Sequence, residues 1–140
     1  LSGTVIGDYI VSGTLAIIGA LTAKDYIDIH DARIEDLSAF LTSIEKMGVK
    51  FEKRDNDTLR VYRSKKLKAT NIQTNIYPGF PTDLQSPTAI LMSQADGVSK
   101  IHEILFEGRL NWLVELEAMR GHIALMNPHE AMIFGKTPLR

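Results

Sequence analysis

The segment Tyr77–Gln85 places a carboxylate next to an unusually stiff turn. Pro78, Gly79 and Pro81 restrict the backbone, and Asp83 follows them where a helix is expected to begin. A carboxylate presented by such a loop can accept a hydrogen bond from a substrate hydroxyl or remove its proton as a general base. A carboxylate at a helix start can instead cap that helix. The sequence leaves both interpretations of Asp83 open.

Other polar groups favour structural roles. The four histidines, His30, His102, His122 and His129, lack the spacing of metal ligands, and we expect neither a metal nor a cofactor. The basic run at 63–68 has no interleaved aromatic residues, so a solvated strand edge is favoured over nucleic-acid binding.

Composition narrows the protein class further. Sixteen Lys and Arg balance seventeen Asp and Glu, and this balance argues against an anionic membrane or nucleic acid as partner. The chain has no cysteine, and its longest apolar run is too short to span a bilayer. We therefore predict a cytoplasmic location. Because the first residue is not Met, we also expect the chain to be part of a longer polypeptide.

Similar residues recur 72 positions apart along the chain. Ile29-His30-Asp31 matches Ile101-His102-Glu103, and Val61-Tyr62 matches Ile133-Phe134. Such a period indicates a duplicated structural unit. We predict one partial domain over residues 1–140, with a first unit at about 1–68 and a second at about 69–140.

Each unit is expected to contain two helices. Ser12-Gly13-Thr14 and Ser86-Pro87 predict the starts of two short helices, and Gly97 predicts the end of the second. Two longer amphipathic helices are predicted over 34–47 and 110–119, where apolar residues recur every three or four positions. Gly48 follows the first of these as a left-handed cap.

Strands complete each unit. Residues 26–29 and 99–102 alternate between apolar and polar, as half-buried strands do. Hairpins are predicted over 49–62 and 122–134, with polar turns at 55–57 and 127–130. The order is βαβαββ, an α/β (α+β) unit whose helices cover one face of a small sheet. Two such units should stack helix against helix around a shared core.

Three motifs carry a resemblance to a known family. The run Tyr77-Pro78-Gly79-Phe80-Pro81-Thr82-Asp83-Leu84-Gln85, the run Ile104–Arg109 and the run Leu116–Met119 resemble UDP-N-acetylglucosamine enolpyruvyl transferases, and Gly7–Thr14 does so more loosely. The resemblance spans nearly the whole chain. The chain also resembles the shikimate-pathway enolpyruvyl transferases, at a lower level of similarity.

The resemblance implies a fold and a set of site residues. The fold is an inside-out α/β barrel, with helices packed inside and sheets outside, of which this chain would supply two of six units. Asp83 would contact or deprotonate the sugar hydroxyl, and Leu105 would contact the nucleotide sugar through its backbone. Arg109 would help to bind anionic groups or would lie on the surface as a structural residue. Asp8 matches a cleft aspartate, but Tyr9 replaces the family's arginine, and Gly108 replaces its asparagine.

The implied reaction transfers the enolpyruvyl group of phosphoenolpyruvate to the 3-hydroxyl of UDP-N-acetylglucosamine, an early step of bacterial peptidoglycan synthesis. Partners would be these two small molecules and the remaining units, because most catalytic groups lie outside the chain. An isolated piece would expose an apolar face that could form a homodimer. A non-catalytic module that binds nucleotide sugars, a structural module of the same fold, and a transferase with a shikimate-type acceptor remain alternatives.

Overall fold

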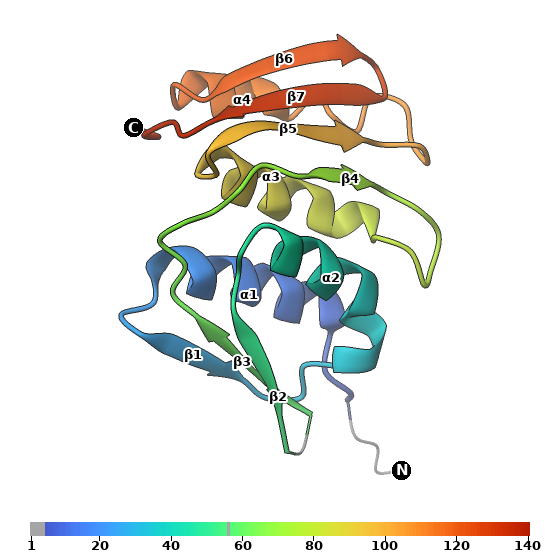
Figure 1. Ribbon diagram of the computed structural model, residues 1–140. Helices are drawn as coiled ribbons and strands as arrows, with labels where there is room; N and C mark the ends of the chain where they lie inside the picture. Colours follow the sequence, from blue (N-terminus) through green and yellow to red (C-terminus); the bar gives the residue numbers. More distant parts are fainter. Residues whose placement is uncertain (1–4, 56) are drawn as a thin grey trace.

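The computed structural model describes residues 5–55 and 57–140, and it has two sheets with helices between them (Figure 1). The first sheet has the order β1-β3-β2 and is wholly antiparallel. Its strands are β1 (Tyr26–Ile29), β2 (Phe51–Arg54) and β3 (Thr58–Tyr62). The second sheet has the order β4-β5-β7-β6, in which only the β4–β5 pair is parallel. Its strands are β4 (Asn71–Gln73), β5 (Gly97–His102), β6 (His122–Asn127) and β7 (Glu130–Gly135).

The helices lie mainly between the two sheets. α1 (Tyr9–Thr22) packs on β1 and β3, and α3 (Gln85–Ser93) packs on β5 and β7. α1 and α3 also touch each other, and α2 (Ser38–Lys46) lies beside them in Figure 1. α4 (Leu113–Ala118) packs on β6. One buried apolar cluster runs through both halves, from Ala16 to Ile133. The predicted fold class, with helices inside and sheets outside, is confirmed.

Strand pairing repeats with the period seen in the sequence. Ile27 faces Val61 across β1 and β3, and Ser99 faces Ile133 across β5 and β7, each residue lying 72 positions further on. The pairing of β2 with β3 recurs in the same way between β6 and β7. The second unit begins with β4, whereas no strand precedes α1 among the described residues from 5 onward. The unit boundaries near residues 68 and 69 stay a prediction.

The predicted start of the first helix is wrong. α1 begins at Tyr9, and Asp8 is its N-cap because the Asp8 carboxylate accepts a hydrogen bond from the Ile10 N–H at 2.8 Å. The Ser12 and Thr14 hydroxyls instead donate to carbonyl oxygens four residues earlier, at 3.1 and 3.0 Å. Serine and threonine hydroxyls can donate hydrogen bonds to backbone carbonyls inside a helix in this way. They therefore do not mark the start of a helix reliably.

The second unit contains three further corrections. A 3₁₀ helix (Thr82–Leu84) precedes α3, so Ser86 lies inside the helix and is not its cap. α3 ends at Ser93, and Gly97 instead opens β5 with a φ of +109°, which glycine tolerates. The predicted helix 110–119 is α-helical only over Leu113–Ala118 and follows a series of turns. Met119 lies just beyond the end of this helix and is exposed.

The other helix predictions hold more closely. Residues 34–47 form a 3₁₀ helix (Ile34–Leu37) that continues into α2, and Gly48 ends it with a φ of +93°. Within residues 5–55 and 57–140, no helix has both the length and the apolar character needed to cross a bilayer.

Candidate active site

The proline-rich turn is anchored by two buried side chains on either side of Asp83. Phe80 is buried, and its ring lies 6.0 Å from that of Phe40, centroid to centroid. Leu84 is fully buried in the 3₁₀ helix that follows. Between these two buried anchors the Asp83 side chain faces solvent and is 57% exposed.

Asp83 is paired with the arginine that the family motif singles out. Arg109 Nη1 lies 2.7 Å from Asp83 Oδ1, and the Arg109 guanidinium also lies 5.1 Å from the ring centroid of Phe106. The N-cap of the 3₁₀ helix is Pro81, so Asp83 is not the capping residue. In such a pair the carboxylate can accept a proton, and the guanidinium beside it can bind an anionic group. The fold brings these two predicted site residues into contact.

Leu105 lies in the segment that carries Arg109. Its backbone N–H donates to Glu103 Oε1 at 3.0 Å, and its side chain is half-buried. A backbone contact from Leu105 to a ligand would therefore come from its carbonyl oxygen. Gly108, with a φ of +77°, lets the segment turn between these two residues.

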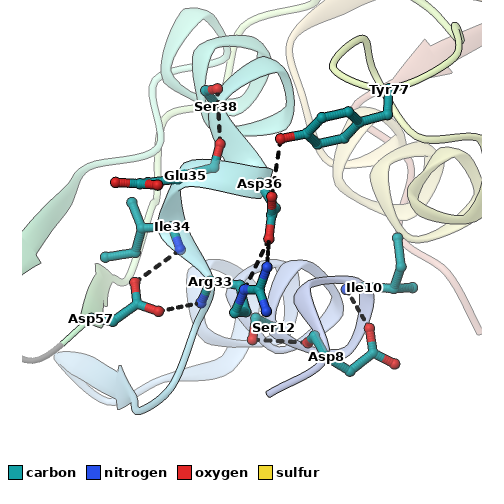
Figure 2. A network of polar contacts seen from close by, with 10 residues as sticks. All are labelled: Asp8, Ile10, Ser12, Arg33, Ile34, Glu35, Asp36, Ser38, Asp57 and Tyr77. Carbon is teal, nitrogen blue, oxygen red and sulfur yellow. Dashed lines mark hydrogen bonds and ion pairs between the residues drawn. The ribbon is translucent and has the colours of Figure 1, made fainter. Parts of the chain in front are cut away.

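A polar chain braces the proline-rich turn from the first unit (Figure 2). The Tyr77 hydroxyl donates to Asp36 Oδ1 at 3.1 Å, and Arg33 Nη2 lies 2.6 Å from Asp36 Oδ2. The hydrogen bond to Asp36 and the negative charge of Asp36 raise the pKa of Tyr77. Sequence reasoning missed this link, because residues 36 and 77 belong to different units.

Glu103 is a second residue that sequence reasoning missed. It is fully buried, and its carboxylate accepts hydrogen bonds from side chains of several elements. The donors are Thr74 Oγ1 at 2.7 Å, Thr82 Oγ1 at 2.6 Å and Gln85 Nε2 at 2.9 Å. Backbone N–H groups of Leu105 and Phe106 also donate to it, at 3.0 and 3.3 Å.

The charge on Glu103 is favoured by these donors. Burial raises the pKa of the Glu103 carboxyl, but the hydrogen bonds from Thr82, Gln85, Thr74 and the Leu105 backbone together hold it below the usual glutamate value. The sequence did contain a signal. Ser99 and Ile101 occupy the buried face of β5, and the alternation of a strand puts Glu103 on the same face.

The remaining candidate groups make structural contacts. His30, His102 and His129 bond through Nδ1 to Thr58 Oγ1, Gln73 Oε1 and the Glu103 carbonyl oxygen, respectively. Trp112 donates to Gln85 Oε1 at 2.9 Å and packs against the core. No cluster of His, Asp or Glu suited to a metal is found within the described part of the chain.

Comparison with known proteins gives a consistent result. The sequence matches the family described as EPSP synthase (3-phosphoshikimate 1-carboxyvinyltransferase) over residues 2–133. It is 38% identical over 135 residues to a UDP-N-acetylglucosamine 1-carboxyvinyltransferase of Sulfurimonas denitrificans, covering 92% of this chain and 32% of that protein. A protein of the same name from Campylobacter hominis is 42% identical over 130 residues, covering 89% of this chain and 31% of that protein.

A solved structure agrees with the sequence matches. The enolpyruvyl transferase NikO from Streptomyces tendae superimposes with a TM-score of 0.88 and 25% identity, over 98% of this chain and 32% of that one. The chain thus spans about a third of the length of the curated relatives it matches. On the family match and on the identity to these relatives, the chain belongs to the EPSP synthase family of enolpyruvyl transferases.

Proposed function

We propose that this chain is part of a transferase that moves the enolpyruvyl (1-carboxyvinyl) group of phosphoenolpyruvate to the 3-hydroxyl of UDP-N-acetylglucosamine. The observation that supports this proposal most is the position of the Asp83 carboxylate. It faces outward on an anchored turn, and its Oδ1 atom lies 2.7 Å from Arg109 Nη1. The names of the relatives supply the acceptor, UDP-N-acetylglucosamine, and the 1-carboxyvinyl group that is transferred. Phosphoenolpyruvate is proposed as the donor on the family resemblance. Peptidoglycan synthesis in the bacterial cytoplasm is the corresponding cellular role.

The proposed chemistry is an addition followed by an elimination. The 3-hydroxyl oxygen bonds to C2 of phosphoenolpyruvate as its proton leaves, and C3 takes up a proton. C3 then loses a proton, the bond from C2 to the phosphate oxygen breaks, and inorganic phosphate departs. Asp83 accepts the hydroxyl proton or orients that hydroxyl. Arg109 exchanges its contact with Asp83 for an anionic group of the substrates, and the Leu105 carbonyl contacts the nucleotide sugar.

The other units of the full-length protein are the proposed partners of this chain. The reaction needs cations around both the phosphate and the carboxylate of phosphoenolpyruvate, and Arg109 alone does not surround two anionic groups. We therefore expect the isolated chain to show no turnover. Release of phosphate by the purified chain alone, dependent on both substrates, would contradict this.

The function is tested in the full-length protein that contains this chain. Asp83→Asn should lower kcat by about 10²–10⁴-fold, because the amide cannot accept the hydroxyl proton. Phosphate release is measured with UDP-N-acetylglucosamine and, separately, with shikimate 3-phosphate as acceptor. Asp25→Asn is the matched control, because it makes the same change at an exposed position before β1.

Two outcomes would overturn the proposal. Turnover of Asp83→Asn equal to that of the Asp25→Asn control would remove Asp83 from the reaction. Turnover of the wild-type protein with shikimate 3-phosphate and none with UDP-N-acetylglucosamine would leave the reaction class intact but replace the acceptor.

An apolar stripe on α1 bears on assembly. Val11, Leu15 and Ile18 follow one another at helical spacing and are 54%, 39% and 49% exposed. We propose that in the isolated chain a second copy covers this stripe, because exposed apolar stripes of this kind favour association. Light scattering should then detect a dimer, and Ile18→Lys should return it to a monomer. A wild-type chain that stays monomeric at high concentration would exclude it.

A further inference from the structure

The Glu103 carboxylate joins the two loops that carry the proposed site residues. Its Oε2 atom accepts a hydrogen bond at 2.6 Å from the hydroxyl of Thr82, the residue directly before Asp83. Through the N–H groups of Leu105 and Phe106 it holds the start of the segment that ends at Arg109. Its backbone is also fixed, because the Glu103 N–H donates to the His129 carbonyl oxygen at 2.7 Å. One side chain therefore sets the spacing between both loops.

The contacts of Glu103 require a carboxylate. Two of its donors are backbone N–H groups, and a third is the Gln85 amide, whose oxygen is already used by Trp112. The two backbone N–H groups are donors only, and the Gln85 amide could present its oxygen to Glu103 only by losing its bond to Trp112. A neutral amide at position 103 would therefore place one donor against another.

The fold does not need Glu103 to form such a turn. In the first unit the equivalent N–H groups, those of Arg33 and Ile34, donate to Asp57 from the hairpin between β2 and β3, at 2.8 and 2.9 Å (Figure 2). The equivalent amides are therefore held by an exposed carboxylate on another element, although the local backbone differs, since Arg33 has a φ of 55° and precedes a 3₁₀ helix. Burying the carboxylate at position 103 adds what the first unit lacks, a direct bond to the turn before Asp83.

We propose that Glu103 is a positioning residue, whose buried carboxylate fixes Asp83 relative to Leu105 and Arg109 for the transfer reaction. This rests on the function proposed above. Glu103 does not contact the reacting atoms itself. Its loss should leave a folded protein in which the two loops move apart, and a displacement of about 1 Å can cost about 10²-fold in turnover.

The test compares a substitution directly after β5 with one on the buried face of β5, in the full-length protein. Glu103→Gln removes the charge with little change in shape. Ser99→Ala is the control, because Ser99 Oγ accepts the Thr70 N–H at 3.2 Å at the opposite end of the strand. Ser99→Ala leaves the Thr70 N–H unpaired away from the loops, whereas Glu103→Gln places an NH2 group against the donors that join the loops. Glu103→Gln should lower kcat about 10²-fold and raise the KM for UDP-N-acetylglucosamine by a smaller factor, because Leu105 moves with its loop.

A second pair of variants keeps the test decisive if Glu103→Gln does not fold. Thr82→Val removes the hydroxyl that joins Glu103 to the proline-rich turn, and Thr82→Ser retains it. The proposal predicts a lower kcat for Thr82→Val and recovery in Thr82→Ser. Equal kcat values for the two Thr82 variants, or for Glu103→Gln and Ser99→Ala, would overturn it.

Hydrogen exchange separates this proposal from the proposed function. In Glu103→Gln, the amides of Leu105 and Phe106 should exchange faster than in the wild type, because a neutral amide oxygen accepts their hydrogen bonds more weakly than a carboxylate does. The amides of Arg33 and Ile34 should not change. Unchanged exchange at all four amides would refute the positioning role, whatever the activity. A wild-type protein without transferase activity would refute the proposed function, while the exchange data would still show whether Glu103 holds the two loops.

Discussion

The two units hold the same pair of backbone amides with carboxylates from different parts of the chain. In the first unit the amides belong to Arg33 and Ile34, and the carboxylate comes from Asp57 in a hairpin turn. Asp57 is exposed, and its carboxylate accepts from this pair of amides, as Figure 2 shows. In the second unit the amides lie 72 positions further on, and the carboxylate comes from Glu103 at the end of β5.

The change of position gives the second carboxylate additional donors. Thr82 and Gln85 bond to Glu103, whereas the residues 72 positions earlier are Ile10 and Gly13, whose side chains donate no hydrogen bond. A side chain on Gly13 would also be crowded, because a Cβ there would lie 2.5 Å from Leu84 Cδ1. The first unit thus packs closely against the second where the second builds its polar network. Duplication preserved the strand pairing and left the polar groups free to diverge.

The largest expected effect tests whether the two units share one core. Ile29 and Ile101 occupy equivalent positions in β1 and β5 and are 5% and 0% exposed. Replacing either with Ala should reduce the free energy of unfolding by about 2–5 kcal/mol, because a cavity remains. Urea unfolding, monitored by Trp112 fluorescence, measures the free energy of unfolding of both variants. If Ile29→Ala left the free energy of unfolding reported by Trp112 almost unchanged, the first unit would unfold independently of the second.

An effect of intermediate size is expected in the pH dependence of the stability that Glu103 provides. The pKa of Glu103 is below the usual glutamate value in the folded state, because the hydrogen bonds it accepts outweigh its burial. Its charge therefore stabilises the fold fully above the unfolded pKa of about 4.3, and this stabilisation is lost as the pH falls through the lower folded value. The difference in unfolding free energy between wild type and Glu103→Gln should be constant near pH 7 and shrink below about pH 4. A difference that grows on acidification would contradict the stated sign.

The smallest effect is expected at the exposed carboxylate. Asp57→Asn should cost less than about 1 kcal/mol, because water can replace its hydrogen bonds. Asn also tolerates the positive φ of 55° at this position, so the backbone is not strained by the change. Thermal unfolding of this variant beside Glu103→Gln measures the contrast. A larger loss for Asp57→Asn would reverse the comparison between the units.

Prediction from the sequence succeeded where the signal was local. The strands and hairpins followed from alternation and turn residues, and the 72-residue period anticipated the repeated register of β3 and β7. The helix starts at Asp8 and Thr82 were missed, because serine and threonine hydroxyls can bond within a helix as well as at its end. The stiff turn that carries Asp83 was recognised because prolines mark such a turn in any fold, and the role of Asp83 stays a prediction.

The sequence by itself therefore determined the duplicated α/β architecture and the turn that presents Asp83. Only the tertiary structure decided that Arg109 lies against Asp83, that Tyr77 reaches Asp36, and that Glu103 is buried beneath the turn. These contacts join residues 18 to 41 positions apart. Periodicity shows which face of an element is buried, but the partner of a long-range polar group is fixed only when separate elements pack together.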